Sequence, residues 1–250
     1  MIGTIYYHLI YRPVFNLLVF LIKILPGNNF GLAILLFTLF FRILLFPLSK
    51  KVALHEKEIS EIQPKIKELQ KKYKDDKDKL SLELLKIFQE KKLNPFTGIF
   101  LAFLQLPIII ALFFSLRSLT LSRRSLTLSS EFSGIYSFLT PPAKISFSFF
   151  NFLDLSEPFL KKGLSQIYWP ASIFLLLTML TSYFQIKIEE EKRKIQDNFF
   201  LFSQYFFLFL GLSIMAYLPS ALVFYWFLNN LFYLIQQRFL FKKLNKDGRN

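Results

Sequence analysis

The stretch from Phe30 to Leu48, FGLAILLFTLFFRILLFPL, constrains this chain most, because it holds nineteen residues and a single charge, Arg42. At about 1.5 Å of rise per residue, a helix of this length crosses most of the ~30 Å hydrocarbon core of a bilayer. Arg42 would then lie about 9 Å inside the nearer end of the span. Burying an arginine there costs about 2.5–3.5 kcal/mol on insertion scales, and such residues usually face protein or water. The stretch therefore predicts a membrane protein with a polar interior feature, unless Arg42 only snorkels to the interface.

The composition agrees with a membrane protein, since 53% of the 250 residues are hydrophobic and are gathered in long runs. There is no cysteine, which excludes disulfides, thiolate metal sites and cysteine nucleophiles. The formal net charge is +14. In a membrane protein we interpret this charge first as a signal for orientation, and only second as a sign of nucleic-acid binding.

The first 29 residues are apolar except for a narrow polar stripe, which predicts a helix that lies in the membrane interface. Pro13 places the start of this helix close to it, and the Pro-Gly-Asn-Asn run at 26–29 predicts a turn. The alternatives are a sixth span or an uncleaved signal anchor. No small-residue cleavage site follows, so we expect no removed signal peptide. The stripe falls within an arc of about 80° on a helical wheel and consists of His8, Arg12, Asn16 and Lys23.

Residues 49–97 have a wholly different composition, with 13 Lys and 9 Asp or Glu. A polar turn at 75–78 separates two stretches with helical periodicity, and Pro64 is expected to kink the first. This pattern predicts an antiparallel helical hairpin in water. The first apolar stripe is Val52, His55, Ile59, Ile62, Ile66, Leu69 and Tyr73, and the second is Leu80, Leu84 and Phe88.

Further apolar runs predict four more spans, so the expected fold class is an all-α integral membrane protein with five transmembrane helices, an N-terminal interfacial helix and a cytoplasmic hairpin. Only Pro219 and its neighbours separate the last two spans, which predicts a tight connection. The expected order is 1–29 interfacial helix and turn, 30–48 span one, 49–97 hairpin, 99–116 span two, 117–165 outer loop, 167–186 span three, 187–198 cytoplasmic loop, 199–218 span four, 220–240 span five and 241–250 basic tail.

The basic residues predict the orientation. Of the 31 Lys and Arg residues, 22 fall on the side that holds the hairpin, the loop 187–198 and the C-terminal end. By the positive-inside rule that side is cytoplasmic, the N-terminus is outside and the C-terminus is inside. Arg42 then lies in the inner-leaflet half of the membrane. The concentration of Arg117, Arg123 and Arg124 on the outer side is left unexplained by this rule.

Most catalytic chemistry is missing from the spans. Both histidines, His8 and His55, lie outside them, and none of the five contains Asp or Glu. Zinc protease motifs, an embedded serine–histidine pair and phosphate loops are absent, so we expect no enzyme, no metal and no cofactor. The polar residues that remain within the spans are the cation Arg42 and seven uncharged residues. Each of the seven, taken alone, is typical of hydrogen bonding between helices. These residues are Thr38, Gln105, Thr178, Thr181, Gln185, Asn229 and Asn230.

Several blocks of the sequence resemble the YidC-type membrane protein insertases, a family shared with the Oxa and Albino proteins of organelles. They are PVFNLLVFLIKILPGNNFGLAILLFTLFFRILLFPLS at 13–49, IQPKIKELQKKYKDD at 62–76, LNPFTGIFLAFLQLPIIIALF at 93–113, LPSALVFYWFLNNLFYLIQQ at 218–237 and, more weakly, FLDLSEPF at 152–159. They occur in the family's order and cover nearly the whole chain. The resemblance is to a short bacterial YidC, without the large outer domain or the lipid-anchor cysteine of other members.

The resemblance implies five spans around a hydrophilic groove that is open to the cytoplasm and to lipid and closed toward the outside. In this sequence the substrate-binding groove would comprise Arg42, Thr38, Gln105, Tyr225 and Trp226. Relatives often carry tyrosine where this chain has Trp226. The implied location is the bacterial cytoplasmic (inner) membrane.

The implied function is that of an insertase and chaperone, which inserts newly made membrane proteins and helps them fold. The implied partners are nascent membrane proteins, the lipid bilayer, the ribosome and the Sec translocon, with possible contact of the basic tail to ribosomal RNA. The alternative is an arginine-lined pore or carrier for anions, with Arg42 as its selectivity residue. A third hypothesis, a purely structural assembly factor, predicts that Arg42 is dispensable and that the hairpin is not.

Overall fold

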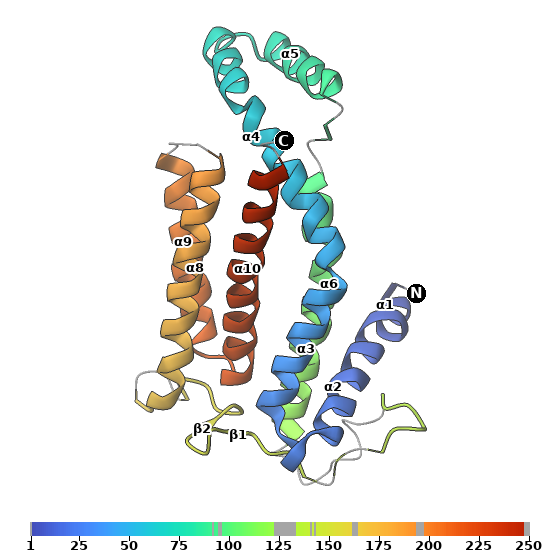
Figure 1. Ribbon diagram of the computed structural model, residues 1–250. Coiled ribbons are helices and arrows are strands. Elements are labelled where there is room, and N and C mark those ends of the chain that lie inside the picture. Colours follow the sequence, from blue (N-terminus) through green and yellow to red (C-terminus); the bar gives the residue numbers. More distant parts are fainter. Residues whose placement is uncertain are drawn as a thin grey trace.

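A computed structural model describes residues 2–91, 93–94, 97–122, 134–140, 142, 144–161, 165–193 and 198–247. The described chain is mostly helical, and its long helices run side by side (Figure 1). Within the described residues, two helices are long and apolar enough to cross a membrane, Gly3–Ile24 and Trp169–Glu191, and a bent pair at residues 30–72 makes up to three. Two shorter helices, Leu106–Thr120 and Leu201–Met215, are also apolar. These findings support an all-α membrane protein.

The N-terminal segment is one continuous helix made of α1 (Ile2–Tyr6), the π-helical turn η1 (Tyr7–Tyr11) and α2 (Arg12–Ile24). The prediction that the helix begins near Pro13 is wrong. Because proline lacks an N–H group, it removes one helical hydrogen bond, and a π-helical turn directly before Pro13 accommodates the loss inside the helix. The helix ends at the 3-10 turn η2 (Pro26–Asn28), at the Pro-Gly-Asn-Asn run.

The helix that carries Arg42 is shorter than the predicted span at 30–48. Helix α3 (Phe30–Leu44) starts at Asn29, whose side chain accepts a hydrogen bond from the Leu32 N–H at 3.0 Å. It stops before Leu45, and α4 (Phe46–Lys72) continues at an angle of 56°. Pro47 explains the bend, because it has no N–H to donate to the Ile43 carbonyl and because its ring fits the first turn of a new helix.

Helix α4 and helix α5 (Lys77–Glu90) form a hairpin at one end of the molecule (Figure 1). Asp76 caps α5 by accepting a hydrogen bond from the Lys79 N–H at 3.0 Å. All residues of the two predicted apolar stripes are buried or half-buried, and Ile62 and Ile87 are the most buried hydrophobic residues of the hairpin arms beyond residue 60. The alternation of three- and four-residue steps therefore marks the protein-facing side of α4, which contacts α5, α6 and α8.

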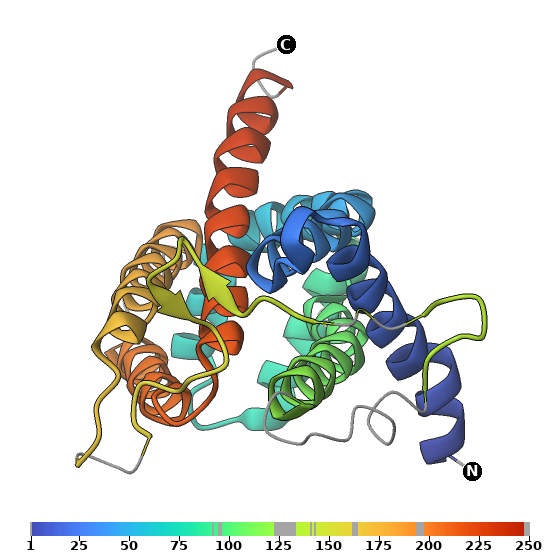
Figure 2. The same cartoon turned by 90° about the horizontal axis from the view of Figure 1, so that it is seen from below.

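The remaining long helices are α6 (Thr97–Ser122), α8 (Ser172–Arg193), α9 (Asn198–Met215) and α10 (Ser220–Asp247). The 3-10 turn η3 (Trp169–Ala171) leads into α8. Helices α6, α8 and α10 all continue past the ends of the predicted spans. Hydropathy predicts the part of a helix that lies in lipid, and the same helix can continue into water as a charged segment. Helix α10 contacts both α3 and α8, whereas α9 packs against α8 (Figures 1 and 2).

A small antiparallel hairpin, β1 (Ser148–Phe149) and β2 (Leu153–Asp154), covers the end of the bundle opposite to α5 (Figures 1 and 2). The Phe149 ring packs against the Phe224 ring, with 4.9 Å between centroids, and against the backbone of Gly31. The ring therefore lies between α3 and α10 and is part of the hydrophobic core to which both helices contribute. These strands lie within the predicted outer loop 117–165, and two-residue strands are too short to predict from a residue pattern.

Backbone hydrogen bonds join this covering segment to the helix ends. The Phe30 N–H donates to the Ser146 carbonyl at 3.0 Å, and the Ala221 N–H donates to the Leu155 carbonyl at 2.8 Å. The Leu160 N–H donates to the Ala216 carbonyl at 2.8 Å. Residues 146–160 therefore connect the ends of α3, α9 and α10 through backbone hydrogen bonds.

The polar stripe of the N-terminal helix also binds protein. The Asn16 side chain donates to the Gly134 carbonyl at 3.0 Å and accepts from the Tyr136 N–H at 2.8 Å. Arg12 donates to the same Gly134 carbonyl and stacks over the Tyr136 ring, and Lys23 donates to Thr140. Three of the four stripe residues thus bind the segment 134–140, whereas His8 is exposed. Helix Gly3–Ile24 is long and apolar enough to span, so the interfacial and spanning interpretations both fit it.

Candidate functional site

Arg42 lies in the last turn of α3, three residues before the bend at Leu45. The carbonyl groups of a final helical turn attract a cation, so the position itself favours a positive charge. The side chain is half-buried. It reaches α10, the neighbouring helix, 187 residues further along the sequence.

Asn229 on α10 holds the Arg42 guanidinium. Nη2 of Arg42 donates one hydrogen bond to the Asn229 backbone carbonyl at 2.5 Å and one to its side-chain Oδ1 at 2.8 Å. Both acceptors are neutral, and no carboxylate is paired with Arg42 in the described part of the chain. Nε of Arg42 is buried and has no hydrogen-bond partner among the described atoms. The contact therefore positions the cation while leaving its charge uncompensated.

Asn229 and Asn230 are neighbours in sequence with different roles. Consecutive residues of a helix point about 100° apart, so two adjacent asparagines on α10 can face two different helices. Asn229 faces Arg42 on α3, whereas Asn230 is buried and donates to the Ser182 hydroxyl on α8 at 2.7 Å. Asn229 was not among the predicted groove residues. The sequence predicted Asn229 as one of seven polar residues typical of interhelical hydrogen bonding, and its contact with Arg42 on α3 confirms that interpretation.

Two tyrosines, Tyr225 and Tyr233, flank Asn229 on α10. They are four residues before and after Asn229, so all three residues share one helix face. The Tyr233 hydroxyl donates to the carboxylate of Glu189 on α8. This face of α10 is therefore the polar side of the site.

Thr38, the predicted partner one turn before Arg42, is buried and donates its hydroxyl hydrogen to the Ile34 carbonyl of the same helix at 2.7 Å. Thr38 shares the helix face of Arg42, but its hydroxyl hydrogen bond is to a backbone carbonyl of α3 and not to Arg42. Gln105 lies in α6, and its side chain falls outside the part of the chain whose side chains the structure describes. Its predicted place in the groove stays a prediction.

Tyr225 and Trp226 line an apolar pocket of about 210 Å³ between three helices. Ile109 and Phe113 of α6 form one wall, and residues of α9 around Gly211 form another. Tyr225 is buried, whereas Trp226 keeps 38% of its surface exposed. The polar face with Arg42 and this apolar pocket therefore meet at Tyr225 on α10.

Among the described residues, no group of three or more His, Cys, Asp or Glu side chains could hold a metal ion. The arrangement consists of a fixed cation, amide and phenol groups, and an adjoining apolar surface. Such an arrangement can bind an acidic, partly apolar ligand.

The chain is similar to proteins of known family. Residues 20–247 match the model of the 60Kd inner membrane protein family. Relatives named "Membrane protein insertase YidC" are 32% identical over 238 residues in Wolinella succinogenes, and 30% identical over 240 residues in both Mesorhizobium japonicum and Pasteurella multocida. These alignments cover 95% of this chain and 38%, 37% and 37% of the relatives, respectively, so the chain spans about two fifths of their length. The match confirms the resemblance to YidC-type proteins, and the chain belongs to the 60Kd inner membrane protein family.

Proposed function

We propose that this chain is a membrane protein insertase, which moves short hydrophilic segments of newly made membrane proteins partway across the bilayer and helps those proteins fold. The observation that carries the proposal is the uncompensated charge of Arg42, held by neutral Asn229 inside an apolar bundle. In surroundings of low dielectric constant, such a charge attracts an acidic segment more strongly than it would in water. The names of the relatives support the same function.

The proposed architecture has five spans, formed by α3 with the start of α4, and by α6, α8, α9 and α10. The distribution of basic residues supports an outer N-terminus and a cytoplasmic C-terminus. In this orientation the β1–β2 segment covers the outer end, and the α4–α5 hairpin stands in the cytoplasm. A groove containing Arg42, Thr38 and Gln105 would then be accessible from the cytoplasmic side.

The apolar part of the substrate would follow the surface at Tyr225 and Trp226. The pocket there joins α6, α9 and α10 and is lined mostly by apolar side chains, which supports contact with a hydrophobic segment. The segment would leave by partition into lipid. Because the sequence contains no phosphate-loop motif, we propose partition and the membrane potential as driving forces, the potential acting on the acidic tail.

The proposed partners are nascent membrane proteins, the ribosome and the Sec translocon. The α4–α5 hairpin would receive the substrate, and the basic tail would anchor the chain at the cytoplasmic surface or contact ribosomal RNA through phosphates. The proposal involves no catalysis, cofactor or metal.

The test is insertion of a single-span client with an acidic tail, in cells depleted of their own insertase and supplied with this protein. We expect wild type and Arg42→Lys to insert the client and Arg42→Ala to fail. Arg117→Ala, which removes an exposed arginine from α6, is the matched control and should behave as wild type. Full insertion by Arg42→Ala would overturn the electrostatic mechanism.

A second measurement separates the insertase from the anion pore or carrier. Proteoliposomes containing this protein and no client should show no chloride flux above empty vesicles. Chloride flux that Arg42→Ala abolishes would instead support the pore, which needs a continuous water path that an insertase does not.

A further inference from the structure

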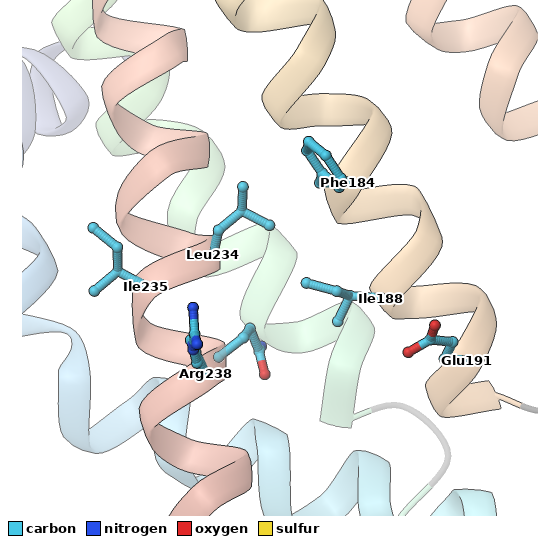
Figure 3. A pocket seen from close by; sticks show the side chains of 7 residues that line it. Phe184, Ile188, Glu191, Leu234, Ile235 and Arg238 are labelled. Carbon is cyan, nitrogen blue, oxygen red and sulfur yellow. The ribbon is translucent and has the colours of Figure 1, made fainter.

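A second pocket, of about 600 Å³, opens between the C-terminal halves of α8 and α10 (Figure 3). Its volume falls within the range of about 300–1,000 Å³ that is typical of ligand sites. The pocket lies apart from Arg42. Arg238, one of its lining residues, follows Asn229 by nine residues and therefore points about 180° away from it around α10.

The walls of this pocket are mostly apolar, although Gln237 also lines it. Phe184 and Ile188 line it from α8, and Leu234 and Ile235 line it from α10 (Figure 3). Phe184 and Ile235 keep 49% and 44% of their surface exposed, so the pocket presents uncovered hydrophobic surface. In a bilayer this surface is suited to a hydrocarbon chain.

Two charges of opposite sign lie at the same end of the pocket. Arg238 lines it from α10 and Glu191 lines it from α8 (Figure 3). Both side chains are exposed, and neither has a recorded hydrogen bond or ion pair within the described residues. They lie close to residues 186 and 240, where the sequence predicts that these two helices leave the hydrocarbon core. The charges therefore coincide with the expected depth of lipid headgroups.

We propose that this pocket binds a phospholipid with an ethanolamine headgroup. The guanidinium of Arg238 donates hydrogen bonds to the phosphate, the carboxylate of Glu191 accepts from the headgroup ammonium, and an acyl chain lies on the four apolar residues. A headgroup with only negative charge would be repelled by Glu191. A choline headgroup has no N–H group to donate to it. The proposal rests on the membrane location of the chain and does not depend on the insertase function.

The test is native mass spectrometry of the full chain in detergent, titrated with phosphatidylethanolamine, phosphatidylcholine and phosphatidylglycerol that carry identical acyl chains. We expect phosphatidylethanolamine to bind best. Arg238→Gln should weaken its binding about tenfold, the scale of one lost charge-assisted hydrogen bond. Glu191→Gln should remove the preference over phosphatidylglycerol, and Leu234→Trp should fill the pocket and lower the binding of all three lipids.

Arg117→Gln is the matched control, because it removes an exposed membrane-boundary arginine that does not line this pocket. Equal binding of the three lipids to wild type would overturn the proposal. So would an equal loss in Arg117→Gln and Arg238→Gln. A dimer without lipid preference that Leu234→Trp abolishes would assign the pocket to a second copy of the chain and would also overturn it.

Discussion

Arg42 and Asn229 join α3 to α10 through two hydrogen bonds from one guanidinium nitrogen, at 2.5 and 2.8 Å. The amide fixes the position of the cation without neutralising it. A carboxylate at residue 229 would hold the guanidinium at least as firmly but would cancel its charge. The pairing with an amide therefore leaves the charge of Arg42 available to the acidic substrate that we propose.

Asn229→Asp should abolish insertion of a client with an acidic tail although Arg42 is still present, because the new carboxylate would form an ion pair with the guanidinium. The client insertion assay measures this effect. Asn230→Asp is the adjacent control, since Asn230 contacts Ser182 and not Arg42. We expect it to retain insertion once protein levels are matched. Normal insertion by Asn229→Asp would show that net positive charge is not required.

A photo-crosslinking amino acid at Trp226 should capture the apolar segment of the client, because Trp226 is partly exposed beside the pocket that α6, α9 and α10 form. The measurement is the crosslinked product from stalled ribosome–client complexes. The same amino acid at Leu176, which is 65% exposed on α8, is the control and should react with lipid. Equal capture at both positions would contradict a defined substrate path.

Gly31→Ala should destabilise the protein by about 1–3 kcal/mol, the usual cost of overpacking, because the new methyl group would collide with the Phe149 ring. Thermal unfolding in detergent measures this cost. Gly211→Ala is the control, since its methyl group would meet open space and alanine is the better helix former by about 0.5–1 kcal/mol. Adding Phe149→Ala to Gly31→Ala should relieve the collision. Additive losses in the double variant would argue against this contact.

Asn16→Leu should loosen the segment 134–140 and cost about 1–3 kcal/mol, because the Gly134 carbonyl and the Tyr136 N–H each lose a partner. Faster protease cleavage of this segment in proteoliposomes is the readout. His8→Leu serves as the control, because His8 belongs to the same polar stripe but is exposed and makes no hydrogen bond with the described residues. An unchanged cleavage rate in Asn16→Leu would mean that other contacts hold the segment.

The hairpin can be tested through Glu83 on α5. A hydrogen bond from Lys86 lowers the pKa of the Glu83 carboxyl, and Lys72 and Lys65 of α4 act in the same direction across the hairpin. Lys72→Gln should therefore move this pKa back toward its ordinary value, measured by NMR titration of the full chain in micelles. Lys57→Gln, elsewhere on α4, should leave it unchanged. The absence of any effect of Lys72→Gln would contradict close packing of α4 and α5.

The sequence predicted those features that follow from hydropathy and period. The charge of Arg42 in an apolar run, the polar turn before α5 and the apolar stripes of the hairpin all depend on residues near one another in the chain. The partner of Arg42 could not be predicted in this way, because seven polar residues were available and the choice of Asn229 depends on how α10 packs between α3 and α8. Pro47 was a local signal for the bend. The apolar run continues past it to Leu48, so the run predicted one uninterrupted span.

The polar stripe of the N-terminal helix shows a second limit of prediction from the sequence. A wheel can show that Arg12, Asn16 and Lys23 share one face, but it cannot distinguish lipid headgroups from a protein segment as their partner. The partner here begins at Gly134, 118 residues after Asn16. Contacts over such separations depend on the tertiary fold and leave no periodic trace in the sequence.

The backbone hydrogen bonds of residues 146–160 have a mechanical consequence. They connect α3, α9 and α10 at one end of the bundle, so a separation of α3 from α10 that keeps these hydrogen bonds would pivot about that end. Displacement then grows with distance from the pivot, and the Arg42–Asn229 contact lies well away from it. A pivoting motion that widens the space between α3 and α10 would break this contact, and would thereby release the guanidinium from its amide partner as room for a chain segment appears.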